Sequence, residues 1–193
     1  MDEFSLYVLD IAMNSVRAGA TKIRILLKED GDVLDFTVED NGCGMTKEQI
    51  EKLADPFFTT RKTRRVGLGI PFLKMLAEMT GGNVRVISTP EAQTDAPPLY
   101  PGGSAHGTRI VARFGRRHID FLPLGDLVGT LVTLIQGAPE RDFTYRHETD
   151  GGTVSLSTEE IRAVLGDGIS LAEPEILAWI RENLEEQYAA LPH

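Results

Sequence analysis

The chain has 193 residues, a net charge of −9 and hydrophobic residues at 41% of its positions, which is typical of a soluble globular protein. Its acidic balance argues against a nucleic-acid partner, because phosphates require a basic surface. Cys43 is the only cysteine, which excludes an internal disulfide framework and fits a reducing cytoplasm. The acidic N-terminal segment is unlike a secretory signal, and no apolar run reaches the roughly 18 residues of a membrane span. We therefore expect a cytoplasmic protein with no membrane partner.

Helical and strand periodicities alternate along the first 114 residues. The first helix is expected to bury a stripe formed by Leu6, Leu9, Met13 and Val16. The expected elements are a helix over 4–18, strands over 23–27 and 34–38, a capped short helix over 46–54, a helix over 70–80, and strands over 83–88 and 107–114.

Residues 117–193 carry no motif with a clear function, but their apolar periodicity predicts that they fold. The expected elements there are a helix over 124–135, a hairpin over 143–156, a capped helix over 157–166 and a helix starting at Pro174. We expect a C-terminal α+β extension of unknown role after a first domain of residues 1–116. The extension either packs on that domain or docks a partner, and Phe143 and Tyr145 on an expected edge strand would permit strand pairing.

Asp10, Asn14 and Arg17 are spaced i, i+4 and i+7, so they share one face of the first helix. Carboxylate and amide oxygens suit Mg²⁺, which takes its remaining ligands from waters and substrate phosphates. Arg17 could neutralise phosphate charge one turn further on. The alternative interpretation is a solvated polar stripe.

Two glycine pairs follow the first hairpin. Asp40 ends a strand and is followed by Gly42 and Gly44, which permit close approach of backbone and ligand. Gly67 and Gly69 open the next helix, whose N-terminal amides favour phosphate. A plain turn and a plain loop-to-helix junction are the alternatives.

A basic stretch lies between the two glycine pairs. Arg61, Lys62, Arg64 and Arg65 follow the segment Asp55-Pro56-Phe57-Phe58-Thr59-Thr60. They could close over a polyphosphate, or they could form a solvated loop.

Taken in order, these segments resemble the GHKL ATP-binding domains of DNA gyrase, heat-shock chaperones, sensor histidine kinases and MutL. Asp10-x-x-x-Asn14 with Arg17 is similar to the N-box, and Asp40-x-Gly42-x-Gly44 to the G1 box. Residues 55–60 resemble the F-box, Gly67-x-Gly69 the G2 box, and Gly107-Thr108 the late glycine-threonine of the adenine site. The similarity covers residues 4–114; residues 14–21 resemble MutL, whereas residues 56–70 resemble histidine kinases more.

The resemblance implies an α/β fold, specifically a two-layer α+β sandwich of Bergerat type. Its mixed, largely antiparallel sheet would be covered on one face by helices. It also implies ATP with Mg²⁺ as cofactors, Asn14 as the metal ligand and Asp10 as the catalytic residue. The implied cofactor-binding residues are Asn14, Arg17, Asp40, Gly42, Gly44, Met45, Arg61, Lys62, Gly67, Leu68, Gly69 and Thr108.

The chain departs from the family in two respects. Asp10 stands where the family usually has Glu, so binding is expected to survive while turnover is slow, since a small misplacement of a catalytic group costs about a hundredfold in rate. We also expect no phosphoacceptor histidine upstream, because nine residues precede Asp10.

The resemblance leaves two functions open. The first is an ATPase or protein kinase that phosphorylates a protein in trans or hydrolyses ATP slowly. The second is a non-catalytic nucleotide-sensing module that regulates a partner protein. Either activity is compatible with a homodimer.

Overall fold

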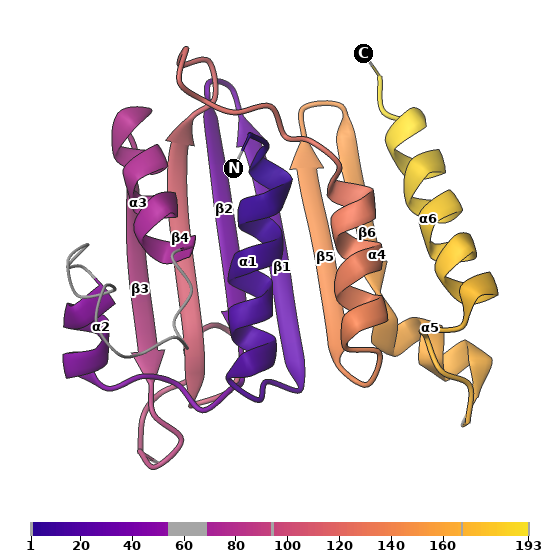
Figure 1. Cartoon of the computed structure of the whole chain (residues 1–193), viewed down its shortest axis with the longest axis horizontal. Helices are drawn as coiled ribbons and strands as arrows, with labels where there is room; N and C mark the ends of the chain where they lie inside the picture. Colours follow the sequence, from indigo (N-terminus) through magenta and orange to yellow (C-terminus); the bar gives the residue numbers. More distant parts are fainter. Residues whose placement is uncertain (1, 54–68, 94, 167, 193) are drawn as a thin grey trace.

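The chain folds into one six-stranded sheet with helices, as the computed structural model shows for residues 2–53, 69–93, 95–166 and 168–192 (Figure 1). Its elements are α1 (Phe4–Arg17), β1 (Lys22–Asp30), β2 (Val33–Asp40), α2 (Lys47–Leu53), α3 (Gly69–Met79), β3 (Asn83–Thr89), β4 (Gly107–Gly115), α4 (Leu127–Gly137), β5 (Asp142–Thr149), β6 (Gly152–Ser157), α5 (Thr158–Leu165) and α6 (Pro174–Ala189). Within these described ranges, no helix has both the length and the apolar character needed to cross a membrane.

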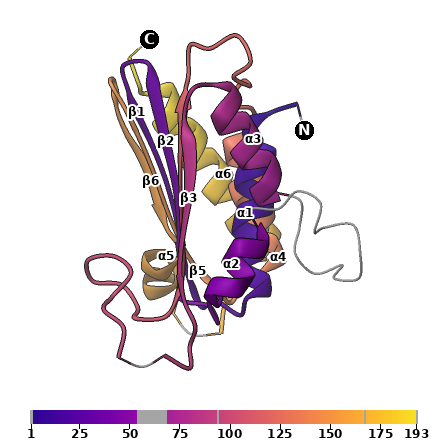
Figure 2. The ribbon, with the colours of Figure 1, turned by 90° about the vertical axis from the view of Figure 1, so that its left-hand side faces the viewer.

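The strand order is β3-β4-β2-β1-β5-β6. All neighbouring strands are antiparallel except β1 and β5, which run parallel. Seen from the side, α1, α3, α4 and α6 lie on the same face of the sheet (Figure 2). The predicted fold class, a mixed sheet with helices on one face, is therefore confirmed.

Helix α1 packs its apolar face on the centre of the sheet, where the Phe4 ring meets Phe36 and Phe114 edge-on with centroids 5.3 and 5.2 Å away. The predicted stripe was wrong in position, because Leu6 is 41% exposed and the other three predicted residues are only partly buried. The buried side chains of α1 are those of Phe4, Ser5, Tyr7, Val8, Ile11, Ala12 and Ser15. Both stripes have helical spacing, so periodicity alone could not separate them.

Side-chain caps define several helix ends. Gln49 accepts a hydrogen bond from the Thr46 amide at 2.8 Å while Thr46 Oγ1 accepts one from the Gln49 amide at 3.3 Å, which is the predicted capping box. Ser157 caps α5 in the same position, accepting from the Glu160 amide. Asp126 caps α4, so this helix begins at Leu127 and not at the predicted residue 124.

The residues after 116 continue the same sheet. Strand β5 pairs with β1 in a register that places Phe143 beside Ile23 and Tyr145 beside Ile25. The expectation that Phe143 and Tyr145 lie on an edge strand was therefore wrong: both are 1% exposed, and the edge strand on this side of the sheet is β6. The predicted domain boundary falls between β4 and α4, and strands from both sides of it join one sheet. The division itself stays a prediction.

A buried polar chain connects β1 with β5 and α6. His147 Nε2 lies 3.0 Å from Glu29 Oε1, and His147 Nδ1 lies 2.8 Å from the Tyr188 hydroxyl, which lies 2.6 Å from the Tyr145 hydroxyl. Arg116 binds the other Glu29 oxygen at 2.6 Å. A neutral His147 that donates from Nε2 and accepts at Nδ1 satisfies both of its neighbours. Burial lowers the pKa of His147 and outweighs the opposing effect of Glu29.

This pKa shift predicts a pH-dependent stability. Below about pH 6.5 the unfolded chain protonates His147 while the folded protein resists protonation, so stability should fall as the pH drops from about 7.5 to 5.5. The contribution is at most about 1.4 kcal/mol per pH unit for one proton. Denaturant unfolding of His147→Gln should show a flatter pH dependence over this window than the wild-type chain. His118→Gln, which changes an exposed histidine, is the control. If the free energy of unfolding changed with pH equally steeply in both variants, His147 would not be the cause of the pH dependence.

Candidate functional site

A cavity of about 240 Å³ lies between α1 and the sheet, beside α2 and the start of α3. Helix α1 contributes polar side chains to it, strands β2 and β4 contribute their ends, and the loop after β2 closes one side. Its lining residues are Ile11, Asn14, Ser15, Arg17, Ala18, Asp40, Cys43, Gly44, Met45, Gln49, Leu53, Ile70, Thr108 and Ile110. Six of the predicted cofactor-binding residues, namely Asn14, Arg17, Asp40, Gly44, Met45 and Thr108, therefore face one common cavity.

Asp40 ends β2 and is 4% exposed. Its Oδ2 accepts a hydrogen bond from the Ser15 hydroxyl at 2.6 Å, and its Oδ1 accepts from the amides of Gly42 at 2.9 Å and Thr108 at 3.2 Å. Burial raises the pKa of Asp40, while these three hydrogen bonds and nearby His106 oppose that rise. The carboxylate is thus fixed by neutral donors from α1, its own loop and β4.

Three polar residues at the site were missed by sequence reasoning. Ser15 holds the Asp40 carboxylate, His106 Nδ1 lies 2.8 Å from the Gly42 carbonyl oxygen, and Ser88 accepts from the Met45 amide at 2.8 Å. Ser88 also contacts the Thr108 hydroxyl at 2.8 Å. Ser15 lies on the buried face of α1, which the sequence periodicity did not identify, so no sequence signal distinguished these three residues.

Gly44 and Gly107 are required by the backbone around Asp40. Gly44 has a φ of +67°, and a Cβ there would overlap the carbonyl oxygen of Thr89. Gly107 has a φ of +122°, and a Cβ there would overlap the carbonyl oxygen of Asp40. Any other residue at either position would force the backbone to move.

The three polar residues predicted on one face of α1 do lie together. Arg17 donates to Asn14 Oδ1 at 3.0 Å and lies 4.0 Å from Asp10 Oδ1. Asn14 Nδ2 is buried and has no hydrogen-bond partner among the described residues. A Cβ on Gly69, the first residue of α3, would overlap Asp10 Oδ2, so this carboxylate lies against the N-terminus of that helix.

The remaining predicted residues lie outside the described part of the chain. They are the segment Asp55–Thr60, the basic residues Arg61, Lys62, Arg64 and Arg65, and Gly67 and Leu68. Within the described part, no three or more His, Cys, Asp or Glu side chains are grouped to hold a metal. Asn14 fits the other mode of Mg²⁺ binding, in which a protein oxygen shares the ion with waters and ligand phosphates.

The raised pKa of Asp40 predicts that its charge opposes folding at neutral pH. Asp40→Asn keeps an oxygen for the Gly42 and Thr108 amides and offers an N–H to Ser15, so its free energy of unfolding at pH 7 should equal or exceed that of the wild type. Asp40→Ala leaves those donors unpaired and should lose about 1–3 kcal/mol. Urea unfolding at pH 7 gives the free energies of unfolding of the wild type and both variants. If Asp40→Asn were destabilised as much as Asp40→Ala, the charge of Asp40 would not oppose folding.

The chain is similar to parts of curated sensor kinases. It is 37% identical over 86 residues to the signal transduction histidine-protein kinase AtoS of Escherichia coli, covering 43% of this chain and 14% of that protein. It is 29% identical over 102 residues to sporulation kinase B of Bacillus subtilis, covering 51% of this chain and 24% of that protein. The matched region is thus less than a quarter of the length of either relative.

Among solved structures, the chain resembles the Aquifex aeolicus MutL ATPase domain complexed with ADP. The TM-score is 0.54 at 17% sequence identity, and the match covers 86% of this chain and 69% of that one. At this identity the likeness supports the fold alone.

A family model provides the assignment. The model of the histidine kinase-, DNA gyrase B- and HSP90-like ATPases matches residues 2–118, which is more than half of the chain and includes every described residue that lines the cavity. The chain therefore belongs to the histidine kinase-, DNA gyrase B- and HSP90-like ATPase family.

Proposed function

We propose that the chain binds ATP with Mg²⁺ in the cavity between α1 and the sheet and acts on a protein partner in the cytoplasm. One observation carries the proposal: the buried Asp40 carboxylate and the polar face of α1 with Asn14 line the same cavity. Membership of the ATPase family supports the choice of ligand.

Asp40 is suited to recognise an exocyclic amine. An ionised carboxylate has about four acceptor positions, and three of them are used by Ser15, Gly42 and Thr108. The fourth can accept an N–H of adenine, whereas guanine presents an oxygen at the equivalent position. The hydrogen bonds from the protein hold the carboxylate in place before a ligand arrives, which reduces the entropic cost of binding.

The polyphosphate end is assigned to α1 and the start of α3. The unpaired Asn14 Nδ2 indicates that this amide has hydrogen-bonding capacity that the described protein does not use. Asn14 would hold Mg²⁺ through its oxygen, and Arg17 and the α3 amides beside Gly69 would neutralise phosphate charge. Bound Mg²⁺ would offset the charge that develops on the transferred phosphoryl group.

Asp10 is the candidate general base. Its carboxylate lies beside Arg17 and Gly69, so it borders the region assigned to the phosphates. An Asp there reaches less far than the Glu usual in the family, which favours slow hydrolysis or transfer to a protein side chain over fast turnover. The alternative function is a nucleotide-sensing module, which the shorter Asp10 also favours.

The assignment of Asp40 predicts a preference for ATP over GTP. By calorimetry, ATP should bind at least about tenfold more tightly than GTP, because GTP would face the carboxylate with an acceptor. In Asp40→Asn the two affinities should approach each other, because an amide offers both a donor and an acceptor. An unchanged preference in this variant, or no heat with ATP in the wild type, would refute the proposed pocket.

The assignment of Asn14 predicts that ATP binding depends on Mg²⁺. Wild-type affinity should fall about tenfold or more when EDTA replaces Mg²⁺, since one charge-assisted contact is worth about 1.5–3 kcal/mol. Asn14→Ala should bind ATP equally with and without Mg²⁺. Asn14→Asp is the matched variant, because its carboxylate can still hold the ion and should keep the dependence. A full Mg²⁺ response in Asn14→Ala would remove Asn14 from this role.

The catalytic alternatives are separated by following γ-labelled ATP in a cell lysate with the purified protein added. Label on another protein supports phosphoryl transfer in trans, and free labelled phosphate supports hydrolysis. Neither product, together with measurable ATP binding, supports the sensing module. A parallel reaction with Asp10→Asn subtracts any label that arises from other enzymes in the lysate.

A further inference from the structure

The net negative charge of the chain lies entirely after residue 116. Residues 1–116 contain 15 acidic and 15 basic residues, whereas residues 117–193 contain 14 acidic and only 5 basic residues. The proposed nucleotide pocket thus lies in an electrically balanced segment. The C-terminal segment carries an excess of nine negative charges, which favours a cationic partner.

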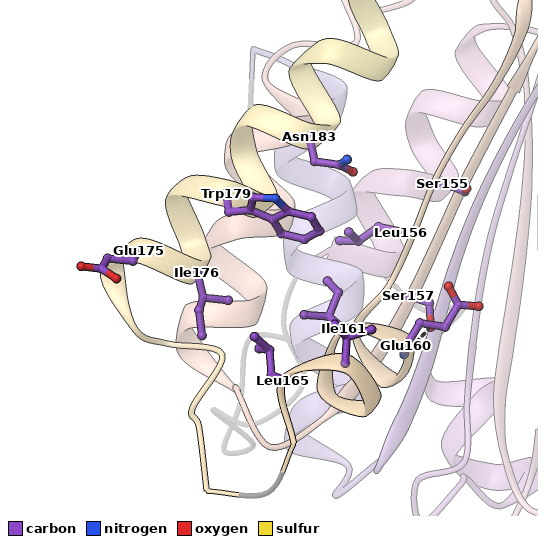
Figure 3. A pocket seen from close by; sticks show the side chains of 11 residues that line it. Ser155, Leu156, Ser157, Glu160, Ile161, Leu165, Glu175, Ile176, Trp179 and Asn183 are labelled. Atoms are coloured by element: carbon purple, nitrogen blue, oxygen red, sulfur yellow. Dashed lines mark hydrogen bonds between the residues drawn. The ribbon is translucent and has the colours of Figure 1, made fainter.

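An apolar groove opens within this acidic segment, between α6 on one side and β6 with α5 on the other (Figure 3). Its volume is about 630 Å³, and we call it the α5–α6 groove. Trp179 and Val164 are 52% and 87% exposed, unusually high values for large apolar side chains that gather in one place. The apolar residues that line it are Leu156, Ile161, Val164, Leu165, Ile176 and Trp179.

Carboxylates flank this apolar floor on both sides. Glu160 projects from α5 and Glu175 from the first turn of α6, on opposite sides of the groove (Figure 3). Among the described residues, neither carboxylate forms an ion pair, unlike Glu159, which pairs with Lys22 at 3.3 Å. The groove therefore combines an apolar centre with an unneutralised acidic rim.

The adjoining sheet edge is already occupied by a side chain. Gln187 of α6 accepts a hydrogen bond from the Ser155 amide at 2.9 Å and donates one to the Ser155 carbonyl oxygen at 3.0 Å. Asn183 Oδ1 accepts a second hydrogen bond from the Gln187 side-chain amide at 2.8 Å. Both backbone groups that Ser155 would offer to an added strand are satisfied, which disfavours an extended occupant.

We propose that the α5–α6 groove binds a short amphipathic helix of a partner protein, with apolar residues toward Trp179 and Leu156 and Lys or Arg residues along its flanks. A second copy of this chain is a poor occupant, because it would bring a like-charged surface against Glu160 and Glu175. The interaction requires no nucleotide, so it stands independently of the proposed function.

The experiment uses the full chain and the fluorescence of Trp179, which is its only tryptophan. The probe is a synthetic Leu/Lys peptide of about 14 residues with helical spacing, about four turns long. Titration at about 0.15 M salt should give a saturable blue shift of the Trp179 emission and a gain of helical circular dichroism. Two control peptides, one with Glu in place of Lys and one with the Leu/Lys order scrambled, should bind at least tenfold more weakly.

Protein variants test whether the groove itself is the site. Val164→Asp, a change at a position exposed to solvent, should weaken Leu/Lys peptide binding at least tenfold. The double variant Glu160→Lys with Glu175→Lys should lose the Leu/Lys peptide and gain the Leu/Glu peptide. Glu140→Lys with Glu185→Lys is the matched control: it makes the same change in net charge at exposed positions that do not line the groove, and it should bind like the wild type.

Three results would each overturn the proposal of a helical partner in the α5–α6 groove. Equal weakening by the two charge-reversed pairs would mean non-specific attraction to an acidic protein. A bound peptide with β-type circular dichroism would mean strand addition. Sedimentation that shows a dimer of the wild-type chain, and a monomer of Val164→Asp, would mean that the groove is an interface between copies.

Discussion

Three segments of the chain meet at the Asp40 carboxylate. The hydroxyl of Ser15 comes from α1, the amide of Gly42 from the loop after β2, and the amide of Thr108 from β4. The closeness of β2 and β4 explains why Gly107 cannot carry a side chain, since a Cβ there would overlap the carbonyl oxygen of Asp40; Gly44 is restricted in the same way by the carbonyl oxygen of Thr89 at the end of β3. One buried acid therefore links α1, the loop after β2 and β4 at the cavity wall.

The donors around Asp40 are neutral, and this has a functional meaning. A cation beside the carboxylate would stabilise its charge more strongly, but it would also compete with a ligand for the same oxygens. Neutral donors fix the orientation of the carboxylate and leave its remaining acceptor capacity for a partner. The raised pKa of Asp40 is the corresponding thermodynamic cost, and such costs are typical of sites that are arranged for binding.

Features that depend on residues close in sequence could be predicted, whereas features that depend on contacts between distant segments could not. The Thr46–Gln49 and Ser157–Glu160 caps and both hairpins follow from residues close in sequence, and they were found correctly. The buried face of α1 and the parallel pairing of β5 with β1 depend on which elements meet in space, which periodicity does not encode. Motif spacing made Asp40 and Asn14 candidate site residues, and both line the cavity. Ser88 and His106 contact the loop after β2 only through the tertiary fold, so motif spacing could not indicate them.

The parallel contact between β1 and β5 has a practical consequence for how the protein can be handled. If the chain were cut after the family-matched segment, β1 would lose the strand that covers one of its sides. A bare row of amide and carbonyl groups, next to the apolar Ile23 and Ile25, would then be open to pairing with other molecules. By covering this side of β1, the β5–β6 hairpin protects the family-matched segment against aggregation.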